Sequence, residues 1–195
     1  LENSNGQILQ ELEEVKKEVG DFFQGMYQTQ GFRPMNELLD RVQPSVTNAM
    51  NDFIQRPYEA EEVKKALFDM APSKAPGVDG FKAGFYQRHW NVLGEDITMV
   101  VLAFLNGGEL PLGLNDTAIT LIPKVRHPQR INQYSPISLC PIINKIAAKC
   151  IANRMREFLH DIVSEEQSAF VPGRLITDNV LIAHESVHAM KKRKK

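Results

Sequence analysis

Apolar residues recur at steps of three and four along much of the chain, which is the spacing that places them on one face of an α-helix. The longest such run covers residues 7–28, where acids and lysines fill the intervening positions. Pro34, Pro44 and Pro57 then break the pattern, because proline interrupts a helix. The helical spacing returns in EAEEVKKALFDM, FYQRHW and EDITMVVLAFLNGG, residues 59–70, 85–90 and 95–108.

Two strands are predicted in the second half of the chain. TAITLIPK, residues 117–124, is rich in β-branched residues and bounded by turn-forming residues, and YSPISL, residues 134–139, is a shorter candidate. A long helix is predicted from Pro141 to about His160, and another over residues 178–190 with Thr177 as its cap. SEEQ, residues 164–167, has the spacing of a capping box. The whole pattern predicts an α+β fold that is predominantly helical.

KAPGVDG, residues 74–80, joins the helical runs. Its proline, glycines and Asp-Gly pair restrict or permit particular backbone angles, so an ordered turn is expected rather than a flexible linker. The segment lacks the G-x-x-x-x-G-K-[ST] spacing of a phosphate-binding loop.

The composition is that of a chain that can bury a core. It has 195 residues, of which 43% are hydrophobic, enough for one domain or one and a half. No apolar run approaches the roughly 18 residues of a membrane span, and no leader is recognised, so an intracellular protein is expected, nuclear or cytoplasmic. Cys140 and Cys150 are expected to be buried, reduced thiols. The chain starts at Leu1 and ends in KKRKK, which suggests a fragment of a longer protein.

Charge is distributed unevenly although the formal net charge is only -1. Residues 1–73 hold 7 Lys and Arg against 13 Asp and Glu, whereas residues 124–195 hold 13 against 6. The basic half is a modest indication of a phosphate-bearing partner, and an ordinary solvated surface is an equal alternative. The KKRKK tail fits a nuclear localisation signal, a phosphate contact or the cationic end of a helix.

AHESVHAM, residues 183–190, contains the H-E-x-x-H spacing of zinc peptidases in His184, Glu185 and His188. A zinc site also needs a third protein ligand, typically further along the chain. The residues after His188 are AMKKRKK, which offer none. A peptidase is therefore disfavoured.

The chain resembles the reverse transcriptases of non-LTR (LINE-type) retrotransposons, especially those of plants. The resemblance rests on the order and spacing of several segments: KAPGVDGF, FYQRHW, LNGGELPLGLNDTAITLIPK, YSPISL, NKIAAKCIANRM, SEEQSAFVPGRLITDN and LIAHE. The acidic N-terminal helix is also similar to the segment that precedes the fingers in that family. In this resemblance Glu185 and His188 belong to a helix without zinc.

The resemblance implies the fingers part of a right-hand polymerase with a small antiparallel sheet. Residues 1–73 correspond to a helical pre-fingers segment and residues 74–195 to the fingers, cut before the palm aspartates. The intact family uses Mg²⁺ for nucleotidyl transfer, with an RNA template, a DNA primer and deoxynucleotides as partners. No Mg²⁺ ligands are expected in this chain, the palm and thumb are missing, and the chain alone is predicted to be inactive. No membrane partner is expected.

The family's binding residues carry over by position. Lys124, Ser135 and Arg174 occupy nucleotide-binding positions, although family members have arginine where Ser135 stands. The template-binding positions hold Lys74, Asp79, Arg126, Gln167 and Asn179. Lys124 has the alternative of a solvated strand-end lysine, and Arg174, Gln167 and Asn179 that of structural hydrogen bonding. Val78 replaces the usual proline of the 74–80 loop. A non-catalytic nucleic-acid-binding protein or a decayed retroelement remnant is the alternative function.

Overall fold

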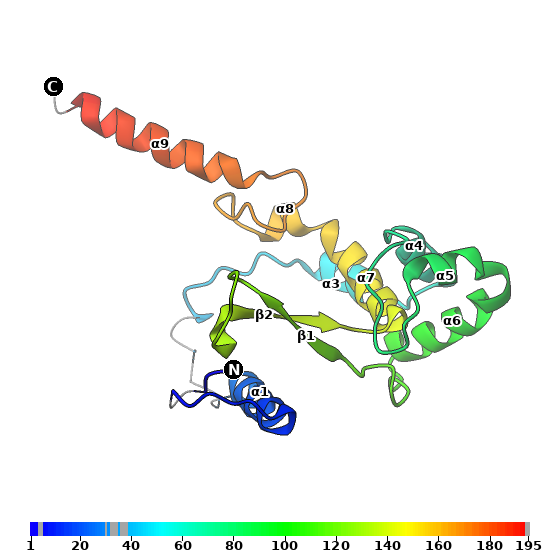
Figure 1. The fold of residues 1–195 in the computed structure, drawn as a ribbon. Coiled ribbons are helices and arrows are strands. Elements are labelled where there is room, and N and C mark those ends of the chain that lie inside the picture. The colour runs from blue at the N-terminus through cyan, green and yellow to red at the C-terminus, as the bar shows by residue number, and fades with distance from the viewer. Residues whose placement is uncertain (4–5, 30, 32–34, 36–38, 194–195) are drawn as a thin grey trace.

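The computed structural model describes residues 1–3, 6–29, 31, 35 and 39–193. Figure 1 shows helices gathered around one core, a long two-stranded hairpin, and a last helix that points away from both. The elements are α1 (Leu12–Tyr27), α3 (Asn48–Gln55), α4 (Ala60–Phe68), α5 (Ala83–Arg88), α6 (Trp90–Leu105), β1 (Ala118–Pro123), the 3₁₀ turn η1 (Ile131–Gln133), β2 (Tyr134–Leu139), α7 (Ile142–Arg156), α8 (Leu159–Ile162) and α9 (Ile176–Arg193). The α+β fold class is confirmed.

The core lies between α4, α5, α6 and α7. Each of these helices turns its apolar face inward, as the spacing of three and four predicts. Their buried side chains are Val63, Ala66, Leu67, Ala83, Tyr86, Ile97, Val101, Ile142, Ile146, Ala147 and Cys150. Residues on both sides of position 73 therefore share one core, and the boundary between a pre-fingers and a fingers part stays a prediction.

The sheet is a single antiparallel hairpin within the described residues. Ala118 pairs with Leu139 at one end and Pro123 with Tyr134 at the other. Both predicted strands are confirmed, each within a residue or two of its expected bounds. The hairpin extends from the helical core toward α1 (Figure 1).

The first helix starts later than its apolar spacing predicts. The spacing places the start at residue 7, but α1 begins at Leu12. Glu2 forms isolated strand bridges with Ile8 and with Arg130, so the first residues are extended. The Glu2 carboxylate also accepts two hydrogen bonds from the Arg130 guanidinium, at 3.0 and 2.8 Å. The bridge at Ile8 thus takes the place of the predicted first turn of the helix.

The expected single helix from Pro141 to His160 is two helices. α7 ends at Arg156, and the short α8 follows at Leu159–Ile162. The SEEQ capping box is also wrong, because residues 164–167 do not start a helix. The carbonyls of Ser164 and Gln167 instead accept hydrogen bonds from Arg174.

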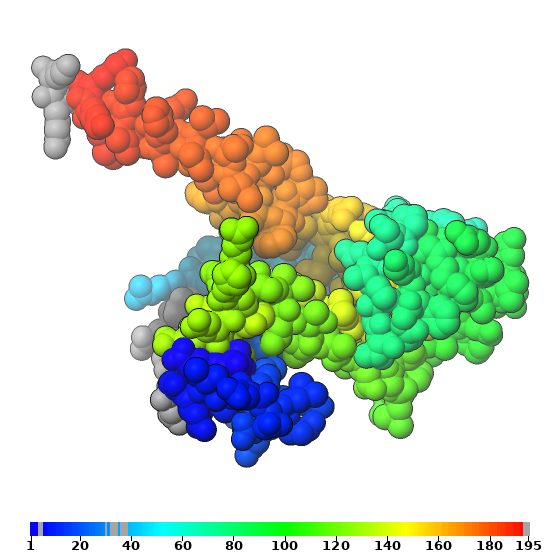
Figure 2. Space-filling view, viewed as in Figure 1, coloured from blue at the N-terminus to red at the C-terminus, as the bar shows by residue number. Residues whose placement is uncertain are grey.

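α9 is longer than predicted and is exposed along its length. It starts at Ile176, so Thr177 lies inside the helix, and it ends at Arg193 rather than at residue 190. The Asp178 carboxylate accepts a hydrogen bond from the Leu175 N–H at 3.1 Å. Every residue from 176 to 192 is exposed. On the face shown in Figure 2 no other segment covers this helix.

Among the described residues, no helix combines the length and the apolar character required to cross a membrane.

Candidate functional site

The hairpin brings two predicted nucleotide-binding residues to the same end. Ser135 pairs with Ile122 across the strands, and the ladder continues where the Lys124 N–H donates to the Gln133 carbonyl at 2.8 Å. Directly paired residues lie on the same face of a hairpin, so Ile122 and Ser135 share one face. Lys124 lies in the bend just after β1, two residues beyond Ile122 and therefore at the same end of the hairpin as Ser135. The sequence predicted both strands, and their antiparallel pairing brings the two residues to the same end of the hairpin.

Lys124 is exposed, and its ammonium donates to the Asn132 carbonyl at 3.1 Å. This is a weak anchor, because water can replace it at the surface. Arg126 follows in the exposed bend after β1 and has no hydrogen bond or ion pair with any described residue. Both cations therefore remain accessible to an anionic ligand.

Arg174, Gln167 and Asn179, the predicted binding residues of the 163–179 segment, form hydrogen bonds within that segment. The Arg174 guanidinium donates to the carbonyls of Ser164 at 2.5 Å, Gln167 at 2.8 Å and Val163 at 3.2 Å. The Gln167 amide donates to the Ala169 carbonyl at 3.1 Å, and the Asn179 amide to the Glu166 carbonyl at 2.7 Å. Arg174 thus uses its guanidinium donors for hydrogen bonds within the chain, which favours a structural role over nucleotide binding. Its nucleotide-binding role stays a prediction.

Lys74 and Asp79 lie in the predicted ordered turn. Gly80 has a φ of +74°, a conformation that glycine adopts without strain. The backbone at Gly77 lies against Cys140 and Pro141 so closely that a Cβ would be 2.6 Å from the Cys140 carbonyl carbon. The Lys145 ammonium also donates to the Ala75 carbonyl at 2.7 Å. The turn is therefore clamped onto the start of α7, as an ordered segment should be.

Asp79 acts inside this turn. Its carboxylate accepts from the Phe81 N–H at 3.1 Å and from the Tyr86 hydroxyl at 3.4 Å. Burial, with the Asp79 charge beside it, raises the pKa of Tyr86 to about 12. Lys74 is exposed. The predicted residues thus fall into three local groups, and among the described residues no hydrogen bond or ion pair joins one group to another.

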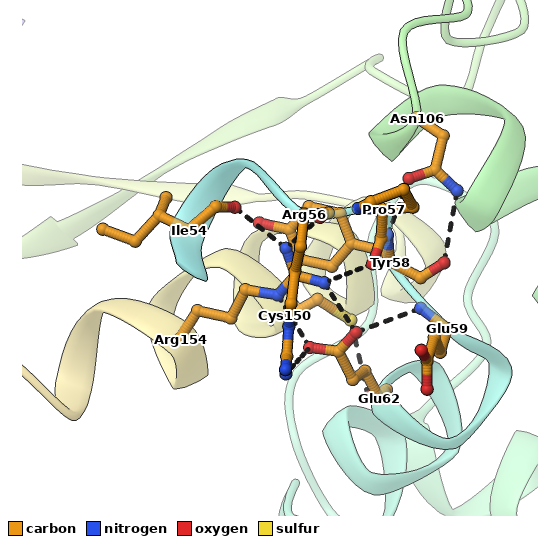
Figure 3. Close-up of polar contacts among 9 residues, drawn as sticks. All are labelled: Ile54, Arg56, Pro57, Tyr58, Glu59, Glu62, Asn106, Cys150 and Arg154. Carbon is orange, nitrogen blue, oxygen red and sulfur yellow. Dashed lines mark hydrogen bonds and ion pairs between the residues drawn. The ribbon is translucent and has the colours of Figure 1, made fainter. Parts of the chain in front are cut away.

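The polar cluster around Arg154 was not predicted (Figure 3). Arg154 is only 2% exposed and lies on α7 facing the core. Its guanidinium donates to both Glu62 carboxylate oxygens at 2.7 Å and to the carbonyls of Ile54 at 2.8 Å, Pro57 at 2.8 Å and Arg56. All five of its N–H donors are used.

This Arg154 cluster joins three parts of the chain. α3 contributes its last carbonyls, α4 contributes Glu62, and the Tyr58 ring lies 3.5 Å below the guanidinium carbon. Asn106, at the end of α6, fixes the Tyr58 backbone through its amide, at 2.7 and 3.2 Å. The sequence did carry a signal, since Arg154 sits four residues after the buried Cys150 on the same helix face.

The electrostatics of the cluster follow from these contacts. The hydrogen bond from Arg154 lowers the pKa of the Glu62 carboxyl below its usual range. Burial raises the pKa of the Cys150 thiol to about 11, and burial also raises the pKa of Tyr58. Cys150 and Cys140 are both free, and Cys140 is only half-buried rather than buried as expected. The contacts around Arg154 are those of a structural cluster, and its thiol, Cys150, is buried.

Several cations of the basic half are also bound internally. Arg130, Arg154, Arg174, Lys124 and Lys145 each donate to a carboxylate or carbonyl of the chain. Within the part of the chain that the structure describes, the lysines and arginines of this half without such a partner are Arg126, Lys149, Arg156, Lys191 and Lys192. The charge available to a phosphate backbone is therefore smaller than the sequence count suggests.

His184, Glu185 and His188 are exposed on α9. In the described ranges, no group of three or more His, Cys, Asp or Glu side chains is placed to hold a metal ion. No chemical step is assigned to these residues, and the use of Mg²⁺ by the resembled family stays a prediction.

No protein-family model matches the chain. The chain is 31% identical, over 186 residues, to the Transposon TX1 uncharacterized 149 kDa protein of Xenopus laevis. The match covers 94% of this chain and 14% of that protein, so the chain spans about a seventh of its relative's length. This similarity supports a transposon-derived protein.

Proposed function

We propose that this chain is the fingers region, with its preceding segment, of an RNA-directed DNA polymerase from a LINE-type retrotransposon. The proposal is supported by the ordered series of segments that resemble reverse transcriptase motifs, and by the similarity to a transposon protein along 94% of the chain. The proposed role is to bind the RNA template and the incoming deoxynucleotide, with the DNA primer bound elsewhere in the polymerase. Mg²⁺ and the chemical step belong to residues other than those described.

The observation that carries this proposal is that Lys124 and Ser135 lie at the same end of the hairpin. An ammonium at the end of a strand supplies a point charge for a triphosphate. Arginine at position 135 would add a planar pair of donors beside it, and the serine side chain is too short and uncharged to do so. The triphosphate should therefore be held weakly in this protein.

Substitution at position 135 tests the proposal in a complete polymerase made by joining this chain to a related palm and thumb. Ser135→Arg should raise kcat/KM for the nucleotide by roughly tenfold to a few hundredfold, the value of a charge-assisted contact. Ser135→Lys should recover less, because an ammonium lacks the two-donor geometry. The measurement is steady-state kinetics at saturating template.

Ser138→Arg is the matched control, because Ser138 pairs with Ile119 and lies on the opposite face of the hairpin. It adds the same charge to the same strand and should leave kcat/KM within about twofold, as surface changes away from a site usually do. Equal gains from both arginine variants, or no gain from Ser135→Arg, would refute a nucleotide contact at position 135.

Ser135 also favours a second candidate function, a non-catalytic nucleic-acid-binding protein or a decayed remnant. In both cases the chain alone should incorporate no nucleotide on a primed RNA template with Mg²⁺. The adjoining coding sequence separates the two. An open frame that continues into palm motifs with paired aspartates supports the polymerase, and stop codons support the remnant.

A further inference from the structure

Three aromatic side chains form a ladder along α5 and the residues beside it. Phe81, Phe85 and His89 are spaced four residues apart, so they lie on one side of the helical turn. The Phe81 and Phe85 ring centroids are 4.6 Å apart, and those of Phe85 and His89 are 4.9 Å apart. Phe81 is 46% exposed and Phe85 37% exposed. Both phenylalanine side chains are therefore partly exposed instead of filling the core.

The ladder is held in place from beneath. Tyr86 is 8% exposed and packs against both phenylalanine rings in T-shaped arrangements, with its ring centroid 6.2 Å from that of Phe81 and 5.4 Å from that of Phe85. Its hydroxyl donates to the Asp79 carboxylate, which also accepts from the Phe81 N–H. The clamped 74–80 turn therefore positions the Phe81 backbone, and Tyr86 packs against both phenylalanine rings.

A surface cavity of about 490 Å³ lies against these rings. Phe81 and Phe85 line it together with Lys82, Arg88 and the backbone of Gly80, and no acidic residue lines it. The cations Lys82 and Arg88 are exposed and have no hydrogen-bond or ion-pair partner among the described residues. Aromatic rings and unpaired cations are thus combined at one site.

We propose that this cavity binds single-stranded nucleic acid, with a base stacked on Phe81 and Phe85 and the flanking phosphates at Lys82 and Arg88. Base stacking on aromatic side chains beside a cationic groove is the usual mode of sequence-tolerant single-strand binding. A duplex fits less well, because its bases are already stacked on one another. Two cations without partners among the described residues, in a lining that has no acidic residue, favour a ligand that carries phosphates over a protein partner.

The inference rests on the nucleic-acid partner of the proposed function and specifies a base-stacking site for it. It is separate from the hairpin end with Lys124 and Ser135, which binds the nucleotide in that proposal. An experiment can therefore refute the stacking site without refuting the nucleotide site, and the reverse.

Fluorescence anisotropy of the full chain tests the site with three labelled probes of equal length. The probes are a twelve-nucleotide oligoadenylate RNA, an abasic strand with the same phosphates, and a duplex of the same length. The wild-type chain should bind the oligoadenylate more tightly than the abasic strand by about fivefold to a hundredfold, the value of one or two stacked bases. The duplex should bind no better than the abasic strand.

Two pairs of substitutions separate stacking from charge. Phe81→Leu with Phe85→Leu keeps an apolar surface and should remove the preference for the oligoadenylate over the abasic strand. Lys82→Gln with Arg88→Gln changes only exposed side chains, so folding is preserved. It should reduce the slope of log K against log salt by about 0.7 for each phosphate that the variant no longer neutralises, on both strands. Phe170→Leu with Lys149→Gln, an exposed aromatic and a cation elsewhere, should change neither quantity.

Each outcome decides the proposal. Equal affinity of the wild-type chain for the oligoadenylate and the abasic strand, or a base preference that survives in the leucine variant, overturns it. Binding that is insensitive to Lys82 and Arg88 but is abolished on neutralising Lys124 and Arg126 also overturns it, while leaving the proposed function standing. Disappearance of the base preference with Phe81 and Phe85, and a smaller salt slope without Lys82 and Arg88, support it.

Discussion

Replacing Arg154 should destabilise the chain more than any other single change on α7. Arg154→Met keeps a side chain of similar length and removes all five donors. It leaves the Glu62 carboxylate and the carbonyls of Ile54, Arg56 and Pro57 without their partner. Breaking a buried ion pair from one side costs about 3–5 kcal/mol, most of it from the group left unpaired. Removing the cation from the face of the Tyr58 ring adds to this, by about 0.5–2 kcal/mol.

This cost is large beside the total stability of a domain, which is about 5–15 kcal/mol. Urea unfolding followed by circular dichroism measures it, with Trp90, the only tryptophan, as a fluorescent probe of the core. Arg156→Met is the matched control, because Arg156 is exposed on the same helix. It should cost no more than about 0.5 kcal/mol.

A double-mutant cycle then identifies the source of the effect. In the double variant Arg154→Met with Glu62→Leu, no carboxylate is left unpaired, so it should be less destabilised than the sum of the single changes by about 1.5–3 kcal/mol. Equal costs for Arg154→Met and Arg156→Met, or additive costs in the cycle, would refute a central role for the Arg154 cluster.

Three further predictions follow from the structure. The pKa of Glu62 is lowered in the fold, so its contribution is fully present above the unfolded value near 4.5 and is lost as pH falls below it; the stability difference between the wild-type chain and Glu62→Gln should therefore shrink between pH 6 and 3, and a constant difference would contradict this. Cys150 is 1% exposed with a pKa of about 11, so iodoacetamide at pH 8 should modify Cys140 first and Cys150 only in denaturant; equal rates on mass spectrometry would count against this packing. The purified chain should bind no stoichiometric zinc, and one zinc per chain by metal analysis, lost on His188→Ala, would reverse that expectation.

Local signals accounted for most of the elements. The spacing of three and four found the helices of the core, and β-branched residues found both strands, because each pattern needs only neighbours along the chain. Lys124 and Ser135 were brought together for the same reason. The predictions fail where distant contacts decide the backbone. Glu2 forms strand bridges with Ile8 and Arg130 where the spacing predicted a helix from residue 7, and Arg174 donates to the carbonyls of the 163–167 loop that resembled a capping box.

The Arg154 cluster shows a different limit. From the sequence alone, a buried arginine on the apolar face of a helix looks the same as an exposed arginine at the border of that face. Only the partners of the arginine distinguish the two cases. Those partners come from residues 54–62, about a hundred positions earlier, and three of them are backbone carbonyls, which have no side-chain signature. The same holds for the aromatic ladder, since only the fold shows that Phe81 and Phe85 remain exposed.

The exposure of α9 has a thermodynamic consequence. A helix that buries no side chain depends on its own hydrogen bonds and residue propensities, and an isolated helix of this length is only marginally stable in water. Its amide hydrogens should therefore exchange through opening of the single helix, whereas those of α7 should exchange only when the core opens. The chain should thus behave as a molecule with two separate stabilities, so that a single melting temperature would describe α3 to α7 and say nothing about its last eighteen helical residues.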